Sequence, residues 1–334
     1  MIFRAILASC YLALSPVAIA HAQPSDGSLQ ELSYINAATE RAISGYTEVI
    51  SGEALNPILM QMEADPSTSA ALAPQADAAL ANLRRQLAAA DEAFDLLPET
   101  IPDLGDDKIE AALAETRPFL LDFRASAVRQ LDLFERQLAA LKAGDLETYS
   151  ALAFQEVDST IATLKAENAF IVINIAAQDD SLPVGKHLES IGASNDVIIA
   201  MLELLGGFET STQEEDLAWA DEAAEAFRRY QVALKQAENR TRSFCRQRVE
   251  RKAREAFDAA CGSLSDFNEV SREMEPHLKG YADLARSIAS EGFDNETIAT
   301  LEELGVAIDT LGVRRFEIQN ERAENFVKLM QVIN

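Results

Sequence analysis

Apolar and polar positions along the chain follow the period of an α-helix. Apolar side chains recur at three- and four-residue spacing, and no run alternates between apolar and polar as a half-buried strand would. Helix-start residues such as Asp145 and Asp294, and breakers such as Gly206-Gly207, divide the pattern into segments. The pattern predicts eight helices, at residues 28–51, 75–97, 107–143, 146–177, 186–205, 213–261, 263–290 and 295–331.

Several of these helices exceed 30 residues, so at about 1.5 Å per residue they reach roughly 50 Å. Long amphipathic helices joined by short turns bury their apolar stripes against one another. The sequence therefore predicts an all-α fold, either one elongated antiparallel helical bundle or two four-helix bundles that share long helices. Residues 146–177 are the most apolar and are expected to be central.

The chain has 334 residues, enough for two domains or one elongated domain. A division near Pro183 predicts an N-terminal bundle at 23–177 and a C-terminal bundle at 185–334. A single continuous domain is the alternative. With only 14 Gly and 10 Pro, the composition is that of a helical protein.

Residues 1–22 have the pattern of a secretory signal peptide: an early Arg4, an apolar run, and Ala20-His21-Ala22 before Gln23. We expect cleavage near Ala22 and a periplasmic or secreted protein. A lipoprotein signal ending at Cys10 is the less favoured alternative, because a second apolar run follows it. No later segment reaches the roughly 20 continuous apolar residues that span a bilayer, so we expect no stable membrane insertion.

The formal net charge of −26 disfavours nucleic acid and anionic membranes as partners. One stretch opposes this charge: seven basic residues and a single acid, Glu250, lie between Arg240 and Arg254. On a helical wheel these cations point nearly all round rather than along one stripe. Pairing within one helix is compatible with four pairs at i and i+4 spacing, namely Glu238–Arg242, Arg246–Glu250, Glu250–Arg254 and Arg251–Glu255.

We favour a structural role for this segment, in which its surplus charge meets acidic faces of neighbouring helices. The alternative is an acidic protein partner or an anionic ligand. In that case the expected contact residues are Arg246, Arg248, Arg251 and Lys252.

Cys245 and Cys261 are the only cysteines after the expected cleavage site, and an even pair in an exported chain suggests a disulfide. If one helix covers 213–261, however, their Cα atoms lie about 24 Å apart, whereas a disulfide needs less than about 7 Å. We therefore favour separate thiols. An intramolecular bond, which needs a break near Arg246, and an intermolecular bond are the alternatives.

Only His187 and His277 follow the expected cleavage site, which leaves no histidine-rich metal motif. The segment SLPVGKHLES resembles the Gly-x-His-x-x-Glu motif of imelysin-like exported helical proteins. Here the spacing is Gly185-x-His187-x-Glu189, one residue shorter, and the resemblance covers no other part of the chain. A ligand or metal site in this region would draw on His187, Glu189, Asp179 and Asp180.

The sequence lacks the Gly-x-Ser-x-Gly, P-loop and Gly-x-Gly-x-x-Gly signatures, and it has no CxxC motif. We therefore expect no catalytic residues and no cofactor. The favoured hypothesis is an exported, non-enzymatic protein that binds another periplasmic protein. The alternative is a helical bundle that binds a small ligand or metal, of the kind used by exported sensors and iron-uptake accessory proteins.

Overall fold

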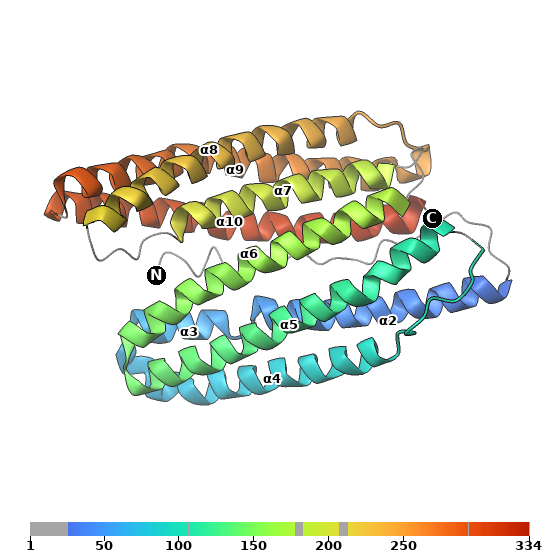
Figure 1. Cartoon of the computed structure of the whole chain (residues 1–334), viewed down its shortest axis with the longest axis horizontal. Helices are drawn as coiled ribbons and strands as arrows, with labels where there is room; N and C mark the ends of the chain where they lie inside the picture. The colour runs from blue at the N-terminus through green and yellow to red at the C-terminus, as the bar shows by residue number, and fades with distance from the viewer. Residues whose placement is uncertain (1–25, 106, 178–182, 207–212, 293, 334) are drawn as a thin grey trace.

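The computed structural model describes residues 26–105, 107–177, 183–206, 213–292 and 294–333 (Figure 1). Within these ranges the regular elements are all helices, eight of them long, and no strand occurs. The all-α fold predicted from the helical period is therefore confirmed. The expected signal peptide, residues 1–22, lies outside the described residues. None of the described helices combines the length and apolarity needed to cross a membrane.

The N-terminal part packs its helices side by side in the lower half of Figure 1. Its hydrophobic core contains buried aromatic rings, among them Tyr46, Phe123 and Phe134. Gly45 allows the helices at residues 26–51 and 69–95 to approach closely, since a Cβ atom there would lie 2.8 Å from the Cβ of Ala90. The elements are α2 (Asp26–Ser51), α3 (Asn56–Ala64), the 3₁₀ turn η1 (Pro66–Thr68), α4 (Ser69–Asp95) and α5 (Asp107–Ala143).

The C-terminal part forms the upper half of the same view, where α7 packs on α8, α8 on α9 and α9 on α10. Its core is built from apolar side chains such as Trp219, Phe267 and Met274. The elements are α6 (Leu146–Ala177), α7 (Pro183–Leu205), α8 (Gln213–Cys245), the 3₁₀ turn η2 (Arg251–Ala253), α9 (Arg254–Glu291) and α10 (Asn295–Ile333).

Helix α6 belongs to both parts. It packs on α5 and on α7, and Figure 1 shows it crossing between the two groups of helices. Tyr149 and Phe170 enter the N-terminal core, whereas Val157 and Leu164 enter the C-terminal core. A helix covered on two sides needs apolar residues on both, which explains the apolar sequence of α6, although α7 is slightly more apolar.

Two helix starts predicted from single aspartates are confirmed. Asp145 accepts hydrogen bonds from the backbone N–H and the hydroxyl of Thr148, at 3.0 and 2.7 Å. Asp294 accepts the equivalent pair from Thr297, both at 2.7 Å. These bonds lower the pKa of both carboxyl groups, because they stabilise the charged form.

Two predicted boundaries are wrong. Residues 52–74 were left outside the predicted helices, but they contain α3 and the start of α4. Pro57 lies in the first turn of α3, where a proline removes no hydrogen bond that the helix needs, whereas Pro74 lies inside α4. The helix expected over 213–261 ends at Cys245 and a new one starts at Arg254. Gly262, expected to end a helix, lies inside α9.

Gly52 follows α2 with φ of +55°, and a Cβ atom there would overlap the ring of Phe134. We predict that Gly52→Ala lowers the free energy of unfolding by about 2–4 kcal/mol, the sum of left-handed backbone strain and overpacking. Urea unfolding followed by circular dichroism measures this loss.

Gly144 is the matched control, since its φ is +71° but nothing lies within 4 Å of an added Cβ. Gly144→Ala should cost only the backbone strain, about 1 kcal/mol. Equal losses for the two variants would contradict the role of the Phe134 contact.

Candidate functional site

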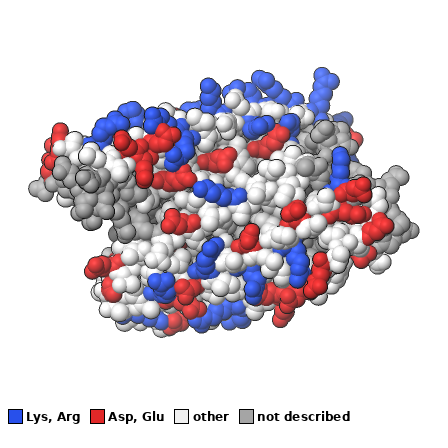
Figure 2. All heavy atoms as spheres, viewed as in Figure 1, with Lys and Arg blue, Asp and Glu red and all other residues white. Residues whose placement is uncertain are grey.

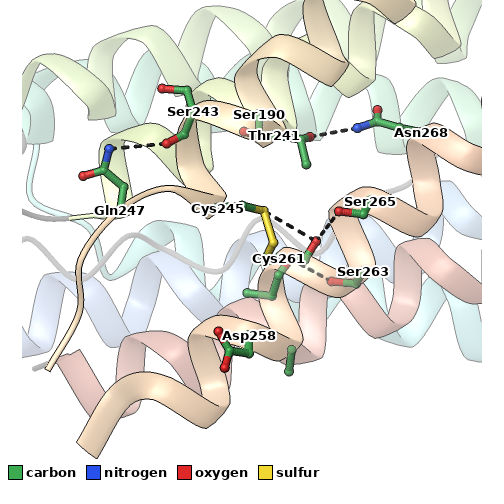
Figure 3. Close-up of a disulfide and its surroundings, with 12 residues drawn as sticks. Ser190, Thr241, Ser243, Cys245, Gln247, Asp258, Cys261, Ser263, Ser265 and Asn268 are labelled. Atoms are coloured by element: carbon green, nitrogen blue, oxygen red, sulfur yellow. Dashed lines mark hydrogen bonds between the residues drawn. A yellow bond between two sulfur atoms is a disulfide. The ribbon is translucent and has the colours of Figure 1, made fainter. Parts of the chain in front are cut away.

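The clearest departure from the sequence prediction is the chain reversal between α8 and α9. Cys245 ends α8 and Cys261 lies in α9, and the two form a disulfide with Cα atoms 5.5 Å apart (Figure 3). The favoured interpretation of separate thiols is therefore wrong. It assumed an unbroken helix, whereas the break after Cys245 lets α9 return along α8.

The residues of the reversal explain where the helix breaks. Four cations crowd into residues 246–252, and like charges one turn apart oppose a helix. Glu250 is extended, with φ of −60° and ψ of 155°. The break also turns Val249 inward, where it packs with Phe257 and Leu264 beside the disulfide. Apolar burial at this end of the molecule thus replaces the helical hydrogen bonds that are lost.

We call residues 246–252 the basic loop. Its four cations, Arg246, Arg248, Arg251 and Lys252, are all exposed. Lys252 lies 3.8 Å from Glu250, and both side chains are mostly in solvent. The other three cations form no ion pair with any carboxylate of the described chain. Figure 2 shows basic side chains along the upper edge of the molecule, where α8 and α9 lie in Figure 1.

The four same-helix pairs expected in this segment do not form. The break after Cys245 disrupts the three that involve residues 246–255, whereas Glu238 and Arg242 both lie in α8 and Glu238 pairs elsewhere. Arg254 instead lies 4.0 Å from Asp258, and Glu238 pairs with Arg272 of α9. Cations on either side of the basic loop, Arg240 and Arg254, thus lie beside carboxylates, as the structural role predicts. Within the basic loop, Arg246, Arg248 and Arg251 form no such pair in the described chain.

His187 and Glu189, expected to share a ligand or metal site, are not brought together. His187 is fully buried, stacked 4.5 Å from the ring of Phe326 and 4.9 Å from that of Phe244. Glu189 forms ion pairs with Lys186 at 3.1 Å and with Arg240 at 2.8 Å. Asp179 and Asp180 lie outside the described residues, and the described part contains no group of His, Cys, Asp and Glu that could hold a metal ion.

A second set of buried polar residues surrounds His187. Glu167 of α6 and Asn195 of α7 have no exposed surface, and the Asn195 side-chain amide donates to Glu167 Oε2 at 3.2 Å. Helix α10 adds Gln319, 1% exposed, and Arg322, 0% exposed. We call Glu167, His187, Asn195, Gln319 and Arg322 the buried polar centre.

Arg322 is the least satisfied member of this centre. Its Nε, Nη1 and Nη2 atoms make no hydrogen bond with the described residues, and its guanidinium carbon lies 5.0 Å from the centre of the Phe267 ring. Burial lowers the pKa of Arg322 to about 10, so the side chain stays charged at neutral pH. Burying an unpaired charge costs several kcal/mol, and a cation–π contact offsets about 2 kcal/mol of that.

The neighbours of Arg322 also keep unused hydrogen-bonding groups. Both ring nitrogens of His187, both side-chain polar atoms of Gln319 and Oε1 of Glu167 have no partner among the described residues. Native interiors leave few such atoms, and a cluster of them calls for a specific explanation.

Burial dominates the ionisation of the two titratable neighbours. It raises the pKa of Glu167 to about 8, opposed by the hydrogen bond from Asn195 and by the charge of Arg322. It lowers the pKa of His187 to about 3, and the charge of Arg322 acts in the same direction. At neutral pH the imidazole is therefore neutral and the Glu167 carboxyl is mostly protonated.

Phe244 connects the basic loop with the buried polar centre. Phe244 immediately precedes Cys245, lies edge-on to His187, and contacts Phe257 with ring centres 4.7 Å apart. The disulfide thus fixes the end of α8, and with it the Phe244 ring that packs on His187.

Comparison of the chain with known protein families, curated proteins and solved structures gives no match. The partial resemblance to the imelysin-like motif is therefore not accompanied by wider similarity, and the site must be interpreted from its own chemistry.

Sequence reasoning missed the residues that α10 contributes. Arg315, Gln319 and Arg322 have i, i+4 and i+7 spacing, in register with the buried Ile308, Ile318 and Phe326. Their position within the apolar stripe of the helix could have revealed them, because residues in that stripe face the core.

The disulfide gives a first prediction for the chain from Gln23 onward. Replacing both Cys245 and Cys261 by Ser should lower the free energy of unfolding by about 3 kcal/mol, since the bond closes a ring across a sequence separation of 16. Urea unfolding with and without a reducing agent measures this loss. The reductant should destabilise the wild type and leave the double variant unchanged. Two thiols titrating in the native, unreduced protein would contradict the bond.

The buried carboxyl gives a prediction about pH. Because the pKa of Glu167 rises from 4.5 unfolded to about 8 folded, its stabilising effect is complete below pH 4.5 and is lost as pH rises through 8. His187 acts oppositely, and only up to its ordinary pKa of 6.5. The wild type should therefore lose about 2 kcal/mol of stability between about pH 6.5 and 8. Glu167→Gln should lose much less, with the remaining loss coming from Asp309, whose pKa burial raises to about 7.

Thermal unfolding across this pH range, converted to free energy, provides the measurement. Glu225→Gln, which removes an exposed acid, is the control and should keep the wild-type slope. A Glu167→Gln profile parallel to that of the wild type would contradict the raised pKa.

Proposed function

We propose that the protein is an exported, non-enzymatic binding protein that docks an acidic partner protein on its basic loop. The observation that supports this function is that Arg246, Arg248 and Arg251 are exposed without carboxylate partners in the described chain, although the whole protein carries a net charge of −26. In a protein rich in acids, cations that stay unpaired remain available to another molecule.

The loop is also fixed before any partner arrives. The disulfide closes its base, and Val249 anchors its middle in the small apolar cluster with Phe257. A preorganised loop loses less conformational entropy on binding than a free one. Exposed arginines steer an acidic partner toward the loop and form bidentate hydrogen bonds with its carboxylates.

The proposal includes export from the cytoplasm, which two features of the chain support. The expected signal peptide directs the chain out of the cytoplasm, and disulfides persist in oxidising compartments such as the periplasm. The disulfide supports this location independently of the N-terminal sequence.

A second candidate function is the binding of a small ligand within the C-terminal helices. It is supported by a different observation, the unpartnered polar atoms of the buried polar centre. The metal variant of this hypothesis has less support, because Glu189 is engaged by Lys186 and Arg240.

The partner-binding function is tested by capture from a periplasmic extract of the native host. We predict that Arg246→Glu, Arg248→Glu and Arg251→Glu together reduce the captured partner at least tenfold. Captured proteins are identified and quantified by mass spectrometry, and capture by the wild type should weaken steeply with salt.

The matched control reverses three other exposed arginines for which no ion pair is found, with Arg85→Glu, Arg129→Glu and Arg286→Glu. This control makes the same change in net charge and should keep the partner. Unchanged capture by the loop variant, at unchanged stability, would rule out a binding role for these arginines.

A further inference from the structure

The buried polar centre has an imbalance of both charge and hydrogen bonds. Arg322 is charged and enclosed, yet its guanidinium has no ion pair with Glu167 or any other described carboxylate. Glu167 is itself mostly neutral, so it does not balance the guanidinium. A protein interior rarely retains such a charge without a counter-charge.

A second buried arginine lies on the same face of α10. Arg315 has 0% exposure, and its Nη1 atom lies 2.9 Å from the sulfur of Met201. Arg315 and Arg322 are close enough for each charge to affect the other, and Arg315 contributes to the lowered pKa of Arg322. The unpaired charge of Arg322 favours an anion beside it and opposes a metal cation.

The unused groups around Arg322 match one kind of ligand. The guanidinium presents five N–H donors in a planar fork. The amide of Gln319 adds donors, as does the N–H of neutral His187, and neither has another partner among the described residues. Planar and tetrahedral oxyanions accept several such bonds at once, and the fork of an arginine fits two of their oxygens.

We propose that the C-terminal helices enclose a small oxyanion, either inorganic or a short carboxylate, held by Arg322 together with Gln319 and His187. This inference rests on the second candidate function and is independent of partner docking on the basic loop. The rings of Phe244, Phe267 and Phe326 line the same region and exclude water from the bound anion.

The arrangement differs from an ordinary buried polar network within the same protein. In the N-terminal half of α6, Glu156 is 1% exposed and accepts from Gln130 at 2.8 Å and from Gln137 at 3.0 Å. Both of its oxygens are satisfied by the chain itself. In the buried polar centre the guanidinium of Arg322, its strongest donor, makes no hydrogen bond with the described residues. A bound anion would accept these hydrogen bonds.

The first experiment identifies what the native protein carries. The chain from Gln23 onward is purified, desalted into chloride-only buffer and denatured, and the released small molecules are analysed by ion chromatography and mass spectrometry. We expect close to one equivalent of a single oxyanion, or an empty site that fills on titration.

The titration uses nitrate, sulfate, phosphate, formate and acetate at constant ionic strength, so that the inorganic and carboxylate classes are separated. The readouts are the melting temperature and the NMR signal of the arginine Nε–H group, which reports hydrogen bonding directly. We expect saturable binding of one class. Arg322→Gln should weaken it at least tenfold, whereas Arg314→Gln should leave it unchanged.

Arg314 is a matched control because it lies on the same helix but faces solvent, where it pairs with Glu273 at 2.6 Å. If Arg322→Gln does not fold, Arg322→Lys keeps the charge and removes the fork, and the wild-type NMR titration stands by itself.

The outcomes are distinct. No released anion and no saturable response to any of the five probes would overturn both the anion and the small-ligand function. Release of one equivalent of a neutral molecule or a metal would overturn the anion and keep the small-ligand function. An equal response in wild type and Arg322→Gln would overturn the assignment to Arg322. None of these results bears on capture by the basic loop.

Discussion

The structure depends on one helix that must be buried on two sides. Helix α6 supplies side chains to the core of the N-terminal helices and to the core of the C-terminal helices, so neither core is complete without it. The polar groups on its buried faces then meet protein rather than water, and each must find a partner there. The two buried acids of α6 show two outcomes, because Glu156 is bonded through both oxygens and Glu167 through only one.

This difference separates the two halves of the molecule by chemistry. In the N-terminal half both oxygens of Glu156 are bonded by side-chain amides, although the amide oxygens of Gln130 and Gln137 keep no partner among the described residues. The C-terminal half keeps unused donors at Arg322 and an exposed, covalently closed loop a short distance along the chain from Phe244. Both candidate sites therefore fall in the same half, and Phe244, which contacts His187, immediately precedes the disulfide that closes the loop.

The sequence predicted the helical class and most helix ends, because periodicity and caps such as Asp145 are local signals. It failed between Cys245 and Cys261 for a physical reason. The residues between them favour a helix by propensity, but the like charges of the basic loop and the packing of α9 back along α8 override that preference. The disulfide could not be predicted while the helix was assumed to continue.

The candidate site was half predicted. His187 was identified, but its proposed companion Glu189 turns to Lys186 and Arg240, and no sequence rule states which face a helix-start residue will use. Gln319 and Arg322 were missed because charged and amide side chains are usually exposed. Their partners come from α6 and α7, more than a hundred residues earlier, so only the tertiary structure brings them together.

The disulfide has one further consequence, for proteolysis. Arg246, Arg248 and Arg251 are exposed, and a trypsin-like protease cleaves the chain after arginine. A cut after any of them falls inside the ring closed by Cys245 and Cys261. The cleaved chain gains one water molecule and two new ends, yet its two pieces stay covalently joined and the last two helices remain attached. A nick at any of these exposed arginines thus does not divide the protein.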